Sequence, residues 1–228
     1  MVDYTLAAPV AALLELGEPK PTQEFAWLDY RAYGVCSEHT AALIKLATDH
    51  SLIEMTDEAN PSAWGPVHAW RALGQLQAVE AVVPLMALFH EVHDNDWVIE
   101  EMPDVFALIG PPAFAALVGY LNNPAFPVYS RMVAAASLMR IAMRAPFLRD
   151  SAIEALAGQL ENYRANSPGM NGVLIADLVE LDAHEKADLI HSVFRACKVD
   201  RFIVGDWREV RLRFNRGTNG ANPTPSAL

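Results

Sequence analysis

One sequence pattern recurs along this chain at intervals of roughly 30 to 40 residues: a helix-type run, a break and a second helix-type run. In the two clearest copies, Ala72–Gly74 precedes Ala81–Leu85, and Leu108–Gly110 precedes Ala113–Leu117. Two looser copies follow, with 140–142 before 153–156 and 180–182 before 188–190. Because one such repeat cannot bury its apolar face alone, we expect the copies to stack into a solenoid.

Apolar residues at helical spacing predict about five helical hairpins. The first is expected to begin with a helix whose apolar face includes Leu28 and Ala32, and the second with a helix lined by Val67, Trp70 and Leu73. No segment shows the sustained alternation that is typical of strands. The predicted fold class is therefore all-α, with the hairpins forming an α-solenoid.

The chain divides by composition into three predicted parts. Residues 1–23 read as a short N-terminal helix followed by a Pro-containing connector, and residues 24–214 as the solenoid domain. The last helix is expected from about Trp207 to Phe214. Residues 215–228 are rich in Gly, Asn, Pro, Ser and Thr, which predicts a disordered tail.

The charge balance limits the classes of partner. Lys+Arg of 17 against Asp+Glu of 28 leaves a formal net charge of −11, whereas nucleic acid and anionic membranes attract basic surfaces. We therefore expect no nucleic-acid partner and no membrane partner. A protein segment that is basic or of mixed charge is the favoured partner, and the oligomeric state is left open.

An uncharged stretch from Val105 to Ser130 is long enough to span a bilayer, but Gly110–Pro112 and Asn122–Pro124 interrupt it. It is expected to be a buried hairpin. Cys36 and Cys197 are the only cysteines, and they fit a reducing compartment. Since the N-terminus also lacks the layout of a signal peptide, the predicted location is the cytoplasm.

Residues His68–Gly74, continuing to Leu85, resemble a HEAT-like repeat of the kind found in phycobilisome-lyase-type proteins, and Asp96–Leu121 resembles a second copy. Across about 24–214 the chain further resembles a group of bacterial HEAT-like proteins without an assigned function, most clearly at Pro66–Gly74 and Gly205–Trp207.

The resemblance implies a right-handed α-solenoid with a concave binding face. Some HEAT-like relatives attach or isomerise bilins, and others remove alkylated bases from DNA. Members of the wider group often carry a cysteine-rich zinc module at the C-terminus, but this chain has no cysteine after Cys197. No residue carries either activity over to this chain.

A cluster of possible metal ligands lies between two predicted helices, at His90, His93, Asp94 and Asp96. Two imidazoles three residues apart, followed by carboxylates, have a spacing that permits a divalent ion. The same residues suit a helix C-terminus followed by the N-cap of the next helix. The interpretation as a helix C-terminus followed by an N-cap is favoured, so no metal and no cofactor are expected.

Six residues are the candidates for a binding surface: Trp97, Glu100, Glu101, Asp104, Asp177 and Trp207. The tryptophans follow aspartates at predicted helix starts, where they suit either partner anchors or core residues beside helix caps. The carboxylates suit an acidic face, and paired carboxylates also perform acid–base chemistry when their environments differ.

The leading hypothesis is a cytoplasmic repeat scaffold whose concave acidic face binds another protein. The alternative is a lyase, isomerase or base-excision enzyme with Trp97, Glu100 and Glu101 near the substrate, although no catalytic residue is identified. A third is a metal or small-molecule sensor at His90 and His93. Convergence of Trp97, Glu100 and Glu101 on an open cavity would favour the enzyme, and burial of Trp97 between repeats would oppose it.

Overall fold

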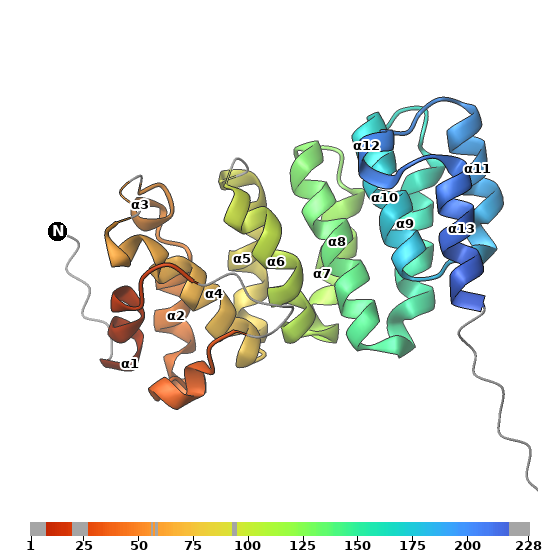
Figure 1. The fold of residues 1–228 in the computed structure, drawn as a ribbon. Coiled ribbons are helices and arrows are strands. Elements are labelled where there is room, and N and C mark those ends of the chain that lie inside the picture. The colour runs from red at the N-terminus through yellow and green to blue at the C-terminus, as the bar shows by residue number, and fades with distance from the viewer. Residues whose placement is uncertain (1–7, 20–26, 56, 58, 93–94, 219–228) are drawn as a thin grey trace, which may run out of the picture. The chain divides into compact units, whose positions relative to one another are not determined.

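The computed structural model describes residues 8–19, 27–55, 57, 59–92 and 95–218. These residues form α-helices and short 3-10 helices, and no strand occurs among them, which confirms the all-α prediction (Figure 1). The chain divides into two compact units, Met1–Ala145 and Pro146–Leu228. The division lies inside the segment 24–214, for which a single repeat domain was predicted.

The first unit contains the following helices, in which η denotes a 3-10 helix: α1 (Ala8–Ala11), η1 (Ala12–Glu15), η2 (Tyr30–Tyr33), η3 (Ser37–His39), α2 (Thr40–Ala47), α3 (His50–Ile53), η4 (Pro61–Trp64), α4 (Gly65–Gln75), η5 (Val79–Ala81), α5 (Val82–Glu91), α6 (Asp96–Ile109), η6 (Pro111–Ala113), α7 (Phe114–Asn122) and α8 (Val128–Arg144).

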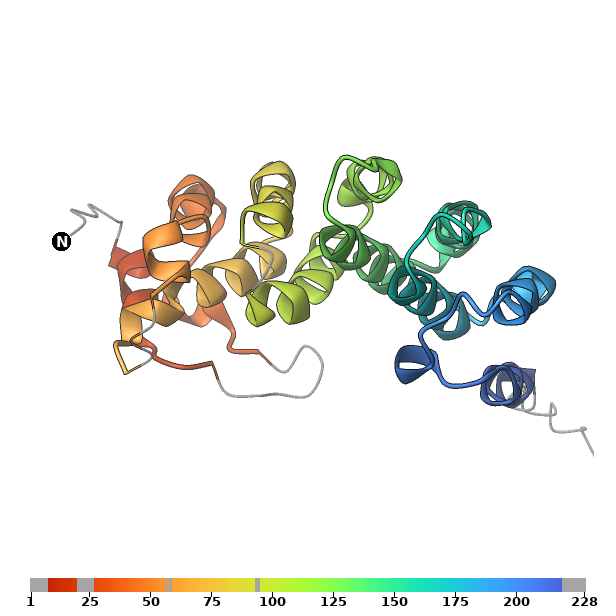
Figure 2. The ribbon, with the colours of Figure 1, turned by 90° about the horizontal axis from the view of Figure 1, so that it is seen from above.

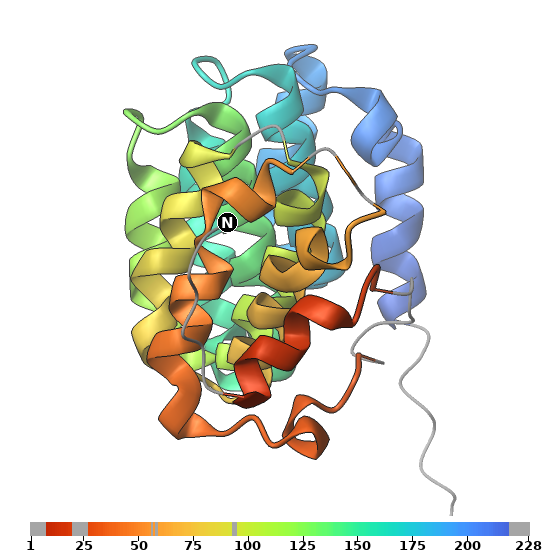
Figure 3. The ribbon, with the colours of Figure 1, turned by 90° about the vertical axis from the view of Figure 1, so that its left-hand side faces the viewer.

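These helices lie in two layers. Helix α4 packs between α2 and α6, and α6 packs between α4 and α8. Helices α2, α5 and α7 form the other layer, as seen from above in Figure 2. Helix η1 contacts α4, and Figure 3 shows it crossing the N-terminal end of the unit. The two-layer packing gives each helix of the α4, α6 and α8 layer neighbours on more than one side.

Helix α4 is the most enclosed element, because residues Gly65 to Gly74 are all buried. The Trp70 indole donates a hydrogen bond from Nε1 to the carbonyl oxygen of Ala47 at 2.7 Å, which ties α4 to α2. At Gly74 the α6 backbone comes so close that an added Cβ would lie 3.3 Å from the carbonyl oxygen of Val105. Glycine is the residue that permits this approach of two helices.

The second unit contains η7 (Pro146–Leu148), α9 (Arg149–Glu161), α10 (Pro168–Glu180), η8 (His184–Lys186), α11 (Ala187–Arg195), α12 (Arg201–Val204) and α13 (Trp207–Thr218). Helix α10 packs against α9, α12 and α13. The buried Asn171 amide donates hydrogen bonds to the carbonyl oxygens of Tyr163 at 2.9 Å and Lys198 at 2.8 Å. This side chain therefore joins the loop before α10 to the loop after α11.

Two predicted boundaries differ from the structure. The helix expected around Leu28 and Ala32 is instead extended chain followed by the 3-10 turn η2, which ends at Gly34 with φ of +83°. Its backbone bonds to Gln75 rather than continuing a helix. Helix α13 continues past Phe214 to Thr218, while residues 219–228 of the expected tail and the expected limit at residue 23 lie outside the described residues.

Within the described part of the chain, no single helix is long and apolar enough to cross a membrane. Helix α6 together with 111–122 has the required length and composition only as a pair, and this pair is bent by 113°.

Candidate functional site

Three tryptophans from neighbouring elements line a pocket in the first unit with a volume of about 120 Å³. Trp64 ends η4, Trp70 lies on α4 and Trp97 lies in the first turn of α6. The remaining lining residues are apolar apart from one asparagine: Ile53, Met55, Ala63, Pro66, Val67 and Asn95. The pocket is therefore bordered by aromatic and other apolar side chains.

Two of the three tryptophans follow asparagine residues that act as helix N-caps and so fix where the indoles lie. Asn60 accepts a hydrogen bond from the Ser62 amide at 3.1 Å and so begins the turn that carries Trp64. Asn95 accepts from the Val98 amide at 3.2 Å and so begins α6 next to Trp97. The rings of Trp64 and Trp97 then meet edge to face, with centroids 5.1 Å apart and planes at 76°.

Several acidic residues lie next to the lining residues of the pocket in the sequence. Glu54, Asp57, Asp96 and Glu100 are exposed and adjoin or closely follow lining residues. Residues 46–130 contain eleven Asp and Glu and a single basic residue, Arg71, so their net charge of −10 accounts for nearly all of the −11 of the whole chain. The pocket therefore opens within a strongly acidic part of the molecule.

Arg71 does not offset this acidic surface, because it is only 4% exposed and forms an ion pair with Glu101 of α6. Its Nε donates to Glu101 Oε2 at 2.8 Å and its Nη2 to Oε1 at 2.5 Å, while its Cζ lies 5.0 Å from the centre of the Trp27 ring. This two-bonded geometry is the strong form of an arginine–carboxylate pair.

The three carboxylates predicted to share one side of α6 have different surroundings. Glu101 pairs with Arg71, Asp104 lies 3.4 Å from Nε of Arg140 on α8, and Glu100 is exposed. Neither Glu100 nor Glu101 lines the tryptophan pocket. The convergence of Trp97, Glu100 and Glu101 that would favour an enzyme is not found at this pocket.

The other two candidates belong to the second unit. Asp177 is buried on α10. Trp207 begins α13 and stacks on His191, with ring centroids 4.6 Å apart and planes at 15°.

Sequence reasoning missed a buried polar pair next to Arg71. The sequence indicates a polar residue near a helix start at His68, and the structure places it in the first turn of α4, where it is only 1% exposed. Its Nε2 lies 2.9 Å from the Gly17 carbonyl oxygen, and its Nδ1 lies 2.7 Å from the Tyr30 hydroxyl. Since a carbonyl only accepts, Nε2 donates to Gly17, and in the neutral ring Nδ1 accepts from the Tyr30 hydroxyl.

Burial lowers the pKa of His68 and raises the pKa of Tyr30, which holds both groups in their neutral forms. The sequence signal for this network was the spacing of His68, Arg71 and Gln75, which places three polar residues on one side of an otherwise apolar helix.

The possible metal ligands are only partly described. His90 Nδ1 lies 3.0 Å from the Tyr120 hydroxyl, Asp96 is exposed in the first turn of α6, and His93 and Asp94 lie outside the described residues. Among the residues that the structure describes, no three His, Cys, Asp or Glu side chains are grouped to hold a metal ion.

The arrangement in the first unit is suited to binding. Its pocket is lined by three indoles, of which Trp97 is only half-buried, and its surroundings offer negative charge. Comparison with known proteins adds no assignment: no family model, curated protein or solved structure matches the chain.

Proposed function

We propose that this chain is a protein-binding scaffold of the HEAT-like type, and that it binds a basic or mixed-charge protein segment at the tryptophan pocket. The observation that carries the proposal is the position of a three-tryptophan cavity within residues 46–130, whose one basic side chain is buried in an ion pair. An apolar anchor and positive flanking charges are the features that such a surface recognises.

The solenoid architecture is part of the proposal. In the first unit α4, α6 and α8 pack in succession, with α5 and α7 in a second layer. This succession supports stacked helical hairpins, which present extended surfaces to partners. A cytoplasmic setting is also proposed, and the two free cysteines, Cys36 and Cys197, support a reducing environment.

The pocket volume restricts the anchor. A cavity of about 150 Å³ holds one benzene ring, so the 120 Å³ found here suits one side chain of about the size of leucine. Burying such a side chain contributes roughly 1.5–3 kcal/mol. This contribution alone gives weak binding, so attraction between Glu54, Asp96 and Glu100 and basic residues of the partner is needed to raise the affinity and the association rate.

The test uses the full chain and a defined probe, a twelve-residue peptide with one central leucine flanked by lysines. Binding is measured by fluorescence titration at low and moderate salt. We expect Trp97→Ala and Glu100→Lys to weaken binding at least about tenfold, because they remove the pocket wall and reverse a flanking charge. Replacing the peptide leucine by serine is expected to have a similar effect.

Glu80→Lys is the matched control, since Glu80 is exposed in the same unit but does not line the pocket. It changes the net charge as much as Glu100→Lys does. If Glu80→Lys and Glu100→Lys weaken binding equally, and the serine peptide binds like the leucine peptide, the interaction is one of net charge alone and the proposal is wrong.

A further inference from the structure

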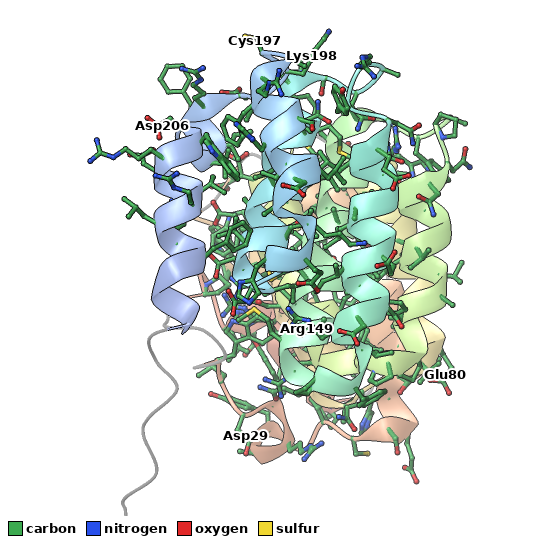
Figure 4. All side chains as sticks on the ribbon, turned by 90° about the vertical axis from the view of Figure 1, so that its right-hand side faces the viewer. Asp29, Glu80, Arg149, Cys197, Lys198 and Asp206 are labelled. Atoms are coloured by element: carbon green, nitrogen blue, oxygen red, sulfur yellow. The ribbon has the colours of Figure 1, made fainter. Side chains whose placement is uncertain are left out.

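A second cleft, in the other compact unit, has the opposite electrostatic character. It has a volume of about 340 Å³ and lies where α11, α12 and α13 meet. Each of these helices contributes one arginine to its lining: Arg195 at the end of α11, Arg201 in α12 and Arg208 in α13. Figure 4 shows the chain around it, from Cys197 and Lys198 after α11 to Asp206 before α13.

The three guanidinium groups form no ion pair or hydrogen bond with any residue in the described ranges. Asp206 also lines the cleft, and both it and the neighbouring Glu209 are engaged by the backbone. Asp206 Oδ1 accepts from the Glu209 amide at 2.9 Å, and Glu209 Oε2 accepts from the Asp206 amide at 2.8 Å. These reciprocal bonds fix both acidic side chains at the start of α13 and leave the arginines available to a ligand.

The surrounding sequence is basic in an otherwise acidic chain. Residues 195–216 contain seven Lys and Arg and three Asp and Glu, a net charge of +4, whereas the whole chain carries −11. A long polyanion would extend beyond this segment and meet the negative charge of the rest of the molecule. The charge distribution therefore favours a small anionic ligand over nucleic acid.

The chemistry of the lining narrows the ligand class. Guanidinium groups match the oxygens of a phosphate group through paired N–H donors. The Trp207 indole, held by its stacking on His191, also lines the cleft and supplies a flat apolar wall. A volume of about 340 Å³ is at the lower end of the range for small-molecule sites, which is roughly 300–1,000 Å³.

We propose that the cleft formed by Arg195, Arg201, Arg208 and Trp207 binds the phosphate monoester of a small ligand. The proposal is independent of the tryptophan pocket, because the two sites lie in different compact units. The phosphate oxygens contact the three guanidinium groups, and the remainder of the ligand lies against the indole.

The test is isothermal titration calorimetry of the full chain at low ionic strength with adenosine monophosphate, O-phosphoserine and adenosine. We expect both phosphate monoesters to bind and adenosine not to bind. Tighter binding of adenosine monophosphate supports a small ligand of the nucleotide type, whereas tighter binding of phosphoserine would indicate a phosphorylated protein segment and contradict a small ligand. Binding is expected to weaken as sodium chloride is added.

Arg201→Ala and Arg208→Ala are each expected to weaken phosphate binding about tenfold or more, because each removes charge-assisted hydrogen bonds. Arg208→Lys keeps the charge but loses the paired donors, so an intermediate loss is expected. Arg213→Ala is the matched control, since Arg213 is exposed on the same helix and outside the cleft lining. Equal losses in Arg201→Ala and Arg213→Ala, or equal binding of adenosine and its monophosphate, would overturn the proposal.

Discussion

The buried ion pair between Arg71 and Glu101 allows a sharp stability prediction. The two side chains are 4% and 11% exposed, and two short hydrogen bonds join them. Replacing Glu101 by alanine leaves the guanidinium buried without its carboxylate. Removing one partner of a buried pair costs about 3–5 kcal/mol, and losing two charge-assisted bonds at about 1.5–3 kcal/mol each gives a similar figure.

Urea titration at pH 7, followed by tryptophan fluorescence and circular dichroism, measures this loss. Glu100→Ala is the control, because Glu100 is the exposed neighbour of Glu101 and its removal is expected to change stability by less than about 0.5 kcal/mol. The double variant Arg71→Met/Glu101→Leu removes both charges together. It is expected to recover most of the loss, since apolar replacement of a whole buried pair is close to neutral.

A cost of less than about 1 kcal/mol for Glu101→Ala would contradict a strong buried ion pair. A double variant as unstable as the sum of the two single variants would contradict it too, because the pair would then have no coupling energy.

The remaining predictions concern buried groups in both units. Burial lowers the pKa of His68 below its ordinary 6.5, so on acidification the unfolded chain binds a proton at this residue before the folded chain does. The free energy of unfolding therefore falls as the pH drops through 6.5 and continues to fall down to the folded-state pKa. Urea titrations from pH 8 to 5 measure this dependence, and His68→Gln is expected to reduce it. Gly74→Ala is expected to lower the melting temperature because its methyl group meets the Val105 carbonyl, whereas Gly119→Ala, with open space around it, raises stability by up to about 1 kcal/mol. Asn171→Ala removes three side-chain hydrogen bonds in the second unit and is expected to cost about 2–4 kcal/mol in the same urea assay, unlike Asn162→Ala at an exposed position.

Helical periodicity predicted the helices well where apolar residues alone define them. The face of Val67, Trp70 and Leu73 is buried as expected, but the structure buries the polar side of α4 as well. The reason is a covering segment, residues 27–34, whose contacts to α4 join residues 38 to 47 positions apart in sequence. No local pattern encodes such contacts, and an isolated short turn has little helical stability of its own.

The candidate site was predicted in part. Trp97 was proposed as a partner anchor or a core residue, and it forms a wall of the pocket. Glu101 was taken as part of an acidic face because its partner, Arg71, lies thirty residues earlier on another helix. A signal was present in the sequence, since Arg71 is the only basic residue between Lys45 and Arg131 and lies within an apolar helix. A lone cation in such a position requires an anionic partner.

The covering segment also determines where a partner can bind on the first unit. The side-chain amide of Gln75 accepts a hydrogen bond from the backbone N–H of Tyr30 at 3.0 Å and donates one to the Leu28 carbonyl oxygen at 2.7 Å. His68 is likewise satisfied by Tyr30 and Gly17, and Arg71 by Glu101. A partner that approached this side of α4 would have to displace bonds that the chain already makes with itself. The tryptophan pocket differs, because Trp64 and Trp70 are already buried whereas Trp97 is only half-buried, and its remaining exposed surface becomes buried when an apolar side chain enters. This difference favours the pocket over the polar side of α4 as the proposed binding site.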